Sequence, residues 1–142
     1  MANYYVNEGV FDLPERVFVD KTIHGLESKL PSDETLGVFV HRRPIEGGKS
    51  LRELVDENVA LNQMRLSAYT VLDEAQAAVG GLPGILLRTR WRLGGVTYYQ
   101  RQAHVAVEGK LMIFAVTTPL DEQAACDETF DSILQTITWR TG

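Results

Sequence analysis

Four carboxamide side chains stand at spacings that place them on apolar surfaces, where they could exchange hydrogen bonds with a partner. Asn58 and Asn62 lie one turn apart in the apolar stripe of a helix expected over Ser50–Leu66. Gln100 and Gln102 alternate along an expected strand and therefore share one face of a sheet. An unpartnered buried carboxamide costs about 1–3 kcal/mol. The asparagines therefore either bond within their own domain or line a binding surface, and the glutamines are either exposed to solvent near a strand end or belong to such a surface.

The residue types that carry catalysis are present, but their spacing does not favour catalysis. His24, His41 and His104 fall on three different expected strands, without a pair at metal-ligand spacing. No serine stands in the context of a hydrolase nucleophile, and Cys126 has no basic neighbour in sequence. We expect no catalytic residue, no metal site and no cofactor, and hence a protein that is not an enzyme.

The charged residues limit the classes of partner. The chain carries a formal net charge of −5, which argues against general attraction to nucleic acid or anionic membranes. We therefore expect no nucleic-acid partner and no direct membrane binding. The strongest basic cluster is predicted to be solvated or paired with acidic groups, and the acidic residues near the last helix are predicted to form a solvated face. The basic residues are Arg88, Arg90, Arg92 and Arg101, and the acidic ones are Asp127, Glu128 and Asp131.

Length and composition indicate one ordinary globular domain over residues 1–142. Apolar residues make up 44% of the chain and charged residues 23%, which is normal for a protein with a packed core. The single cysteine, Cys126, cannot form an intrachain disulfide and is expected to be a buried thiol. The N-terminus has neither the basic start nor the apolar run of a signal peptide. We therefore expect a cytoplasmic protein.

The order of expected elements is strands, helix, strands, helix. Ser50 and Glu53 form a capping-box pattern that predicts the start of the first helix. The last helix is expected to start near Thr118, and Gly80–Gly84 is expected to form a turn or loop. Strands are expected over Tyr4–Val6, Val10–Leu13, Val17–Leu26, Leu36–Arg42, and Thr70–Ala75 or a little beyond.

The segment from Ile85 to Thr117 predicts three antiparallel strands. Gly94-Gly95 and Glu108-Gly109 are two-residue hairpin signals within alternating sequence. Two-residue turns pair Leu93 with Val96, Trp91 with Tyr98, Leu87 with Gln102, and Gln102 with Ala115. Both faces of this sheet are apolar enough to need cover, by helices, the N-terminal strands, a second copy or a ligand. The expected fold class is α+β, a curved antiparallel sheet packed with two main helices.

The arrangement resembles the effector-associated (Eag) chaperones of the bacterial type VI secretion system, in the DcrB-like group with a PsbP-like fold. The resemblance covers nearly the whole chain and depends on order and spacing. It is carried by four segments: the start from Tyr4 to Pro14, the strand Val38–Arg42, the helix Leu51–Leu66 and the stretch Tyr99–Gln102. Members of that family are understood as cytoplasmic homodimers that shield the hydrophobic N-terminal transmembrane segments of secreted effectors, often Rhs proteins with a PAAR domain.

The resemblance implies a partner-binding groove lined by aliphatic and amide side chains. The aliphatic positions match Ile23, Val38, Val40 and Leu66, and the amide positions match Asn58 and Gln102. Helix and strand periodicity add Asn62 and Gln100 as partner-binding residues. Gly25 departs from the pattern, because a bulky aliphatic residue is expected there, and predicts a hollow or a bulge in the strand.

Two other classes of function remain open. One is a small-molecule carrier or enzyme with a pocket between helix and sheet, in which His104 or His41 supplies the polar group. The other is a structural subunit of a larger assembly.

Overall fold

The computed structural model describes residues 2–6, 9–13 and 23–139, and the side chains from Gly25 to Trp139. Its elements follow the predicted order of strands, helix, strands and helix. In chain order they are β1 (Ala2–Val6), β2 (Gly9–Leu13), β3 (Ile23–Lys29), β4 (Thr35–Pro44), α1 (Leu51–Arg65), β5 (Ser67–Val79), β6 (Leu82–Leu93), β7 (Val96–Val107), β8 (Lys110–Pro119), the 3-10 turn η1 (Leu120–Glu122) and α2 (Gln123–Thr136).

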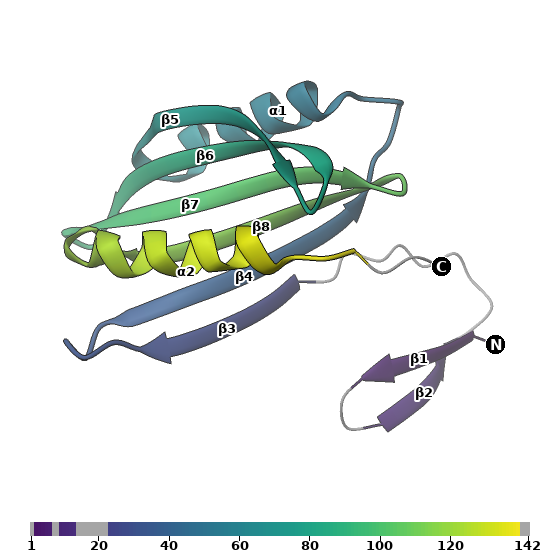
Figure 1. Ribbon diagram of the computed structural model, residues 1–142, viewed down its shortest axis with the longest axis horizontal. Helices are drawn as coiled ribbons and strands as arrows, with labels where there is room; N and C mark the ends of the chain where they lie inside the picture. The colour runs from purple at the N-terminus through teal and green to yellow at the C-terminus, as the bar shows by residue number, and fades with distance from the viewer. Residues whose placement is uncertain (1, 7–8, 14–22, 140–142) are drawn as a thin grey trace.

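Six strands form one antiparallel sheet in the order β3-β4-β8-β7-β6-β5 (Figure 1). The hairpin of β1 and β2 forms a separate two-stranded sheet. The two helices lie on opposite faces of the six-stranded sheet (Figure 1). The α+β class, with a curved antiparallel sheet and two main helices, is therefore confirmed.

The predicted register of the central strands is confirmed. Leu93 pairs with Val96 and Trp91 with Tyr98 across the β6–β7 hairpin. Gln102 pairs with Leu87 on one side and with Ala115 on the other. The turn residues Gly94 and Gly95 have φ values of 58° and 80°, the left-handed conformation that a tight hairpin turn requires.

Several element boundaries differ from the prediction. β5 begins and ends beyond Thr70–Ala75, and it has register shifts between Ser67 and Thr70 and between Val71 and Asp73. The glycine-rich turn uses only Gly80-Gly81, since Leu82, Pro83 and Gly84 already pair in β6. The expected start of the last helix at Thr118 is wrong because β8 continues to Pro119 and η1 precedes α2.

Of the strand expected over Val17–Leu26, residues 17–22 lie outside the described residues. The described strand β3 begins at Ile23 and continues past Leu26 to Lys29. No helix in the described part of the chain is long and apolar enough to cross a lipid bilayer.

The larger part of the core lies between the sheet and α2. Phe130 and Cys126 of α2 are fully buried and pack with Ala103, Val105 and Val116 of the sheet. We call this side of the sheet the α2 face. The predicted burial of the Cys126 thiol is confirmed, and burial raises its pKa to about 11.

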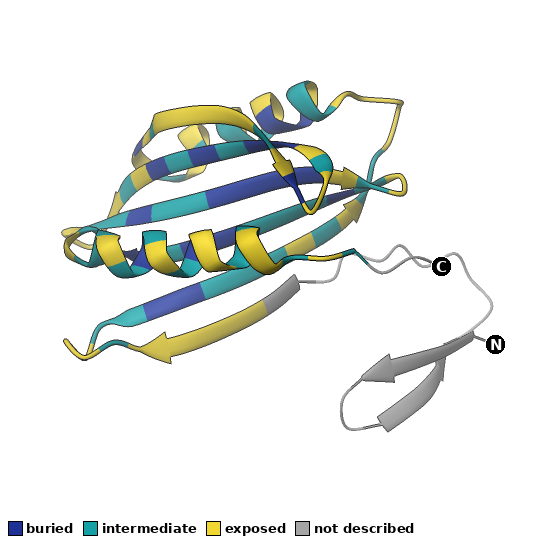
Figure 2. Ribbon diagram, in the orientation of Figure 1, coloured by how far each residue is buried: buried dark blue, intermediate teal, exposed yellow. Residues whose placement is uncertain are grey.

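A smaller core lies between the opposite side, the α1 face, and helix α1. Val55 is fully buried there and packs with Ile85 and Leu87 of β6. Figure 2 shows buried positions concentrated along the central strands, while β3 and β5 at the two edges are mostly exposed. The only buried residues of α1 are Leu54 and Val55, so this helix is docked along a narrow stripe.

Candidate functional site

The α1 face carries a groove of about 210 Å³ between the helix and the strands that the helix leaves open. The packing contacts of α1 are with the β5–β6 side of the sheet, at Val71, Ile85 and Leu87. The groove opens toward β8 and β4. Its lining residues come from α1 (Asn58, Asn62) and its C-cap (Leu66), β6 (Trp91), β7 (Gln100, Gln102), β8 (Ile113, Ala115) and β4 (His41).

Helix α1 supplies the wall of the groove. Its start is fixed by the predicted capping box: Glu53 N donates to Ser50 Oγ at 3.2 Å, and Ser50 N donates to Glu53 Oε1 at 3.4 Å. From that start, the helical spacing places Asn58, Asn62 and Leu66 in a line along the groove.

The two asparagines retain hydrogen-bonding capacity. Asn62 Nδ2 makes one long hydrogen bond, 3.5 Å to the Tyr69 hydroxyl. The carboxamide of Asn58, which is half-buried, has no hydrogen-bond partner among the described residues. The asparagines therefore do not merely cap the backbone of their own domain, and Asn58 can donate to and accept from a bound molecule.

Strand β7 supplies the floor of the groove as a ladder of hydrogen-bonded side chains. Gln100 Nε2 donates to Thr117 Oγ1 at 2.9 Å, and Gln102 Nε2 donates to Gln100 Oε1. His104 Nε2 lies 2.8 Å from Gln102 Oε1. An amide oxygen can only accept, so His104 Nε2 carries a proton and donates it. The ladder thus runs in one direction, from the histidine to the threonine.

His104 is the buried end of this ladder. Its side chain is fully buried, and its Nδ1 has no partner in the described part of the chain. Burial, with a smaller contribution from repulsion by Arg43 and Arg52, lowers its pKa to about 4. The imidazole is therefore neutral at pH 7, with Nδ1 as an unprotonated acceptor. An orphaned acceptor costs less than an orphaned N–H donor, which favours this direction of the ladder over its reverse.

One end of the groove is aromatic. The Trp91 ring stacks on Tyr98, with centroids 5.9 Å apart, and on Tyr69, with centroids 6.4 Å apart. Tyr69 is buried, whereas Trp91 and Tyr98 are half-buried. Flat ring surface is therefore accessible beside the amides.

The other end of the groove lies on β4, beside the β3 edge. His41 is exposed at the rim, and its pKa is lowered by partial burial and by Arg43. A Cβ at Gly25 would lie 3.6 Å from the Phe39 ring, and one at Gly37 would lie 2.8 Å from it. The β3–β4 register is continuous through Gly25, so the strand is not bulged there. The Phe39 ring occupies the space that a bulky residue at position 25 would need.

The structure brings together five of the eight residues predicted to bind a partner: Asn58, Asn62, Leu66, Gln100 and Gln102. Ile23 pairs with His41, so the strand register assigns it to the α1 face, while its side chain lies outside those described. Val38 and Val40 pair with Val116 and Phe114 and therefore lie on the α2 face. A single groove containing all eight residues is not formed.

Four lining residues were absent from the predicted set. Trp91, Ile113 and Ala115 fall on the glutamine face in the predicted register, so the alternation of the strands already contained that signal. His41 could not be found in this way. Its neighbour Ile113 belongs to β8, and the pairing of β4 with β8 joins strands far apart in sequence.

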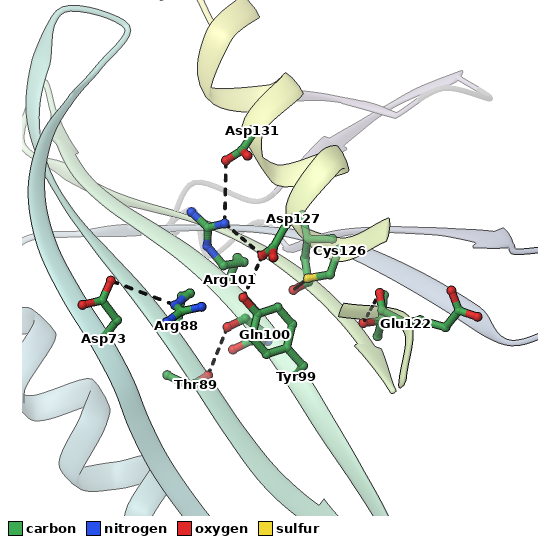
Figure 3. A network of polar contacts seen from close by, with 12 residues as sticks. Asp73, Arg88, Thr89, Tyr99, Gln100, Arg101, Glu122, Cys126, Asp127 and Asp131 are labelled. Atoms are coloured by element: carbon green, nitrogen blue, oxygen red, sulfur yellow. Dashed lines mark hydrogen bonds and ion pairs between the residues drawn. The ribbon is translucent and has the colours of Figure 1, made fainter. Parts of the chain in front are cut away.

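The α2 face holds a different polar network (Figure 3). The Tyr99 hydroxyl donates to Asp127 Oδ1 at 2.7 Å, and Arg101 Nη1 donates to the same oxygen at 3.0 Å. The Arg101 guanidinium also lies 4.5 Å from the centre of the Phe130 ring. Asp127 therefore faces the sheet, and the predicted solvated acidic face is wrong at this residue.

Pairing of the basic cluster with acidic groups is confirmed at Arg101, which pairs with Asp127, and more loosely at Arg88, which lies 4.0 Å from Asp73.

The described residues contain no group of three or more His, Cys, Asp or Glu side chains placed to hold a metal ion. The groove offers neutral amides, one histidine at its rim and apolar surface. Chemically, such a lining can hold an apolar partner and exchange hydrogen bonds with its polar atoms.

The fold matches several solved structures at low sequence identity. A Pseudomonas aeruginosa protein of unknown function superimposes with a TM-score of 0.82 at 16% identity, covering 100% of this chain and 99% of that one. LpqN of Mycobacterium tuberculosis, described as involved in cell envelope biogenesis, gives 0.62 at 14% identity, covering 80% and 69%. Cyanobacterial PsbP from Synechocystis gives 0.59 at 14% identity, covering 82% of each chain. The fold is therefore PsbP-like.

Sequence comparison identifies the family. No curated protein matches the chain significantly. The family model described as DcrB matches residues 8–136, nearly the whole chain, and the protein therefore belongs to the DcrB family.

Proposed function

We propose that this protein is a cytoplasmic, homodimeric chaperone that binds and shields the N-terminal transmembrane helices of type VI secretion effectors of the Rhs/PAAR type. It holds them until they are loaded on the secretion spike. We call the bound helix the guest. The resemblance of the sequence to the Eag chaperones supports this choice of guest, and membership of the DcrB family is compatible with it.

The observation that carries the proposal is the composition of the groove. Its amides, Asn58, Asn62, Gln100 and Gln102, stand among the apolar side chains of Leu66, Trp91, Ile113 and Ala115. Asn62, Gln100 and Gln102 already bond within the domain, but Asn58 has no partner among the described residues, and a purely apolar guest would leave it unsatisfied. A transmembrane helix can pair with it, because its backbone carbonyls keep a second lone pair and its interfaces carry small polar residues.

Binding needs no chemical energy source. A transmembrane helix exposes about 20 apolar residues in water. Burying that surface is favourable by about 25 cal/mol per Å², and the amides add register and discrimination. The protein would therefore hold and release guests by equilibrium binding, without consuming a nucleotide.

The proposal is tested by co-purification with the N-terminal transmembrane segment of an Rhs effector fused to a soluble carrier protein. Asn58→Leu is expected to reduce retention of the fusion at least several-fold, because the free carboxamide of Asn58 is replaced by a group without hydrogen-bonding capacity. Gln63→Leu on the same helix is the matched control, since Gln63 is exposed and does not line the groove. Equal retention by the wild type, Asn58→Leu and Gln63→Leu would contradict the proposal.

A second variant, Gln102→Leu, tests the floor of the groove. Gln102 is 3% exposed and bonds to both Gln100 and His104, so its loss also affects stability. Thermal unfolding of the variant separates a loss of stability from a loss of guest binding. Loss of the guest from a protein that is still folded at the assay temperature supports the proposal, and full retention by such a protein opposes it.

The predicted alternative, a carrier or enzyme with a pocket between helix and sheet and a histidine as its polar group, would use this groove, with His41 at its rim. The groove volume of about 210 Å³ is below the roughly 300–1,000 Å³ of typical ligand pockets. His104, at the buried end of the ladder, is fully buried and does not line the groove. The geometry therefore favours an elongated guest that extends beyond the groove over a small ligand enclosed by it.

A further inference from the structure

We infer that the guest surface continues from the groove onto the tip of the β6–β7 hairpin, and that a bound helix lies parallel to β7 between His41 and Val96. This inference rests on the proposed function and assigns the guest its direction and its second contact.

The groove alone is too small for its guest. A membrane-spanning helix of about 20 residues is about 30 Å long and about 10 Å across, which is roughly 2,400 Å³, whereas the groove encloses about 210 Å³. Most of such a helix would remain in water unless other apolar surface on the same face covered it. The α1 face must therefore offer further contacts in line with the groove.

That surface begins where the groove ends. Trp91 lines the groove and stacks on Tyr98, and the next pair along the same face is Leu93 with Val96. Leu93 is 65% exposed and Val96 is 41% exposed, although both are large apolar residues. The aromatic pair and the aliphatic pair thus form a strip that runs from the groove to the hairpin tip.

The strip is free of charge because of strand alternation. Arg90 and Arg92 flank Trp91 in sequence but point to the α2 face. On β7, Thr97 and Tyr99 alternate in the same way with Val96 and Tyr98. An uncharged strip continuous with an amide-lined groove fits an uncharged helix better than a soluble peptide or a nucleic acid.

The dimensions match a transmembrane helix. His41 pairs with Ile113, which pairs with His104, so His41 marks the level of His104 on the sheet. Eight residue steps along β7 separate His104 from Val96, or about 26 Å at about 3.3 Å per residue. At about 1.5 Å per residue, a helix of that length contains about 18 residues.

The direction of the guest is tested by photo-crosslinking with the same effector segment fused to a soluble carrier. A benzophenone side chain replaces either His41 or Val96, and the crosslinked guest residues are mapped by mass spectrometry. We expect the two positions to label guest residues about 18 apart. Labelling of the same guest residues from both positions, or labelling from His41 but not from Val96, would overturn the inference.

The contribution of the strip is tested by Leu93→Ser, with Leu26→Ser as the matched control. Leu26 is 66% exposed, as Leu93 is at 65%, but it pairs with Val38 on the α2 face. We expect Leu93→Ser to lower retention of the guest at least threefold, and Leu26→Ser to leave it unchanged. Equal retention by both variants would overturn the inference and leave the proposed function intact. A wild type that retains no guest would overturn both.

Discussion

At the scale of single residues, the groove depends on how its amides share their hydrogen bonds. Gln100 and Gln102 bond in a ladder that ends on Thr117, whereas Asn58 has no hydrogen-bond partner within the described part of the chain. Strand alternation was enough to predict that the two glutamines share a face. The direction of the ladder could not be predicted, because it depends on His104 and Thr117, whose side chains meet the glutamines only in the folded sheet.

His104 gives the stability of the protein a pH dependence. Its folded-state pKa of about 4 lies below the ordinary value of 6.5, so between these values the unfolded chain binds the proton and the folded chain does not. Its contribution to stability is therefore complete above pH 6.5 and is lost as the pH falls toward 4, by at most about 1.4 kcal/mol per pH unit.

His104→Gln keeps a donor toward Gln102 and removes the titration. We expect its urea unfolding free energy to fall less steeply than that of the wild type between pH 6.5 and pH 4.5. If the unfolding free energies of the two proteins changed in parallel with pH, His104 would have an ordinary pKa in the folded protein.

Asp127 is predicted to matter more for stability than its neighbour Asp131. Asp127 accepts hydrogen bonds from Tyr99 and from Arg101, whose side chain is only 15% exposed. Asp131 lies 3.7 Å from Arg101 and is 56% exposed, so solvent screens its interaction. We expect Asp127→Asn to lower the unfolding free energy by about 1–3 kcal/mol and Asp131→Asn to lower it by less than about 0.5 kcal/mol. Equal losses in chemical denaturation would contradict this assignment.

At the scale of elements, local signals predicted most of the sheet. The Gly94-Gly95 and Glu108-Gly109 turns set the register of β6, β7 and β8, because a two-residue turn leaves one pairing for each strand. The pairing of β4 with β8 has no such local signal, since α1 and three strands lie between them in sequence. The resemblance to the Eag chaperones assigns Val38 and Val40 to the groove, and without a local signal for this pairing the sequence offers no register that places them on the α2 face.

The capping box of α1 is predicted to stabilise the wall of the groove. Ser50→Ala removes the side-chain acceptor for Glu53 N and should cost about 1 kcal/mol, whereas Ser50→Gly should cost only a few tenths. Chemical denaturation of both variants measures the difference. A loss from Ser50→Ala no larger than that from Ser50→Gly would show that the cap contributes little to the folded protein.

At the scale of the whole molecule, the two faces of the sheet are covered unequally. Helix α2 packs over the α2 face with Phe130 and Cys126 fully buried, while α1 docks by a narrow stripe and leaves the groove open beside it. The sequence predicted that both faces need cover, but composition alone could not show which one keeps a free surface. That depends on where α1 comes to rest, which is fixed by the packing of Val55 on Ile85 and Leu87.

The central claim is that this free surface holds an apolar polypeptide. Native mass spectrometry of the protein, co-expressed with the effector segment fused to its carrier, tests it most directly. We predict a complex of the intact chain with the fusion in a fixed stoichiometry, and its loss on Asn58→Leu but not on Gln63→Leu. The chain alone, or the chain with a stoichiometric small molecule in place of the segment, would contradict the claim.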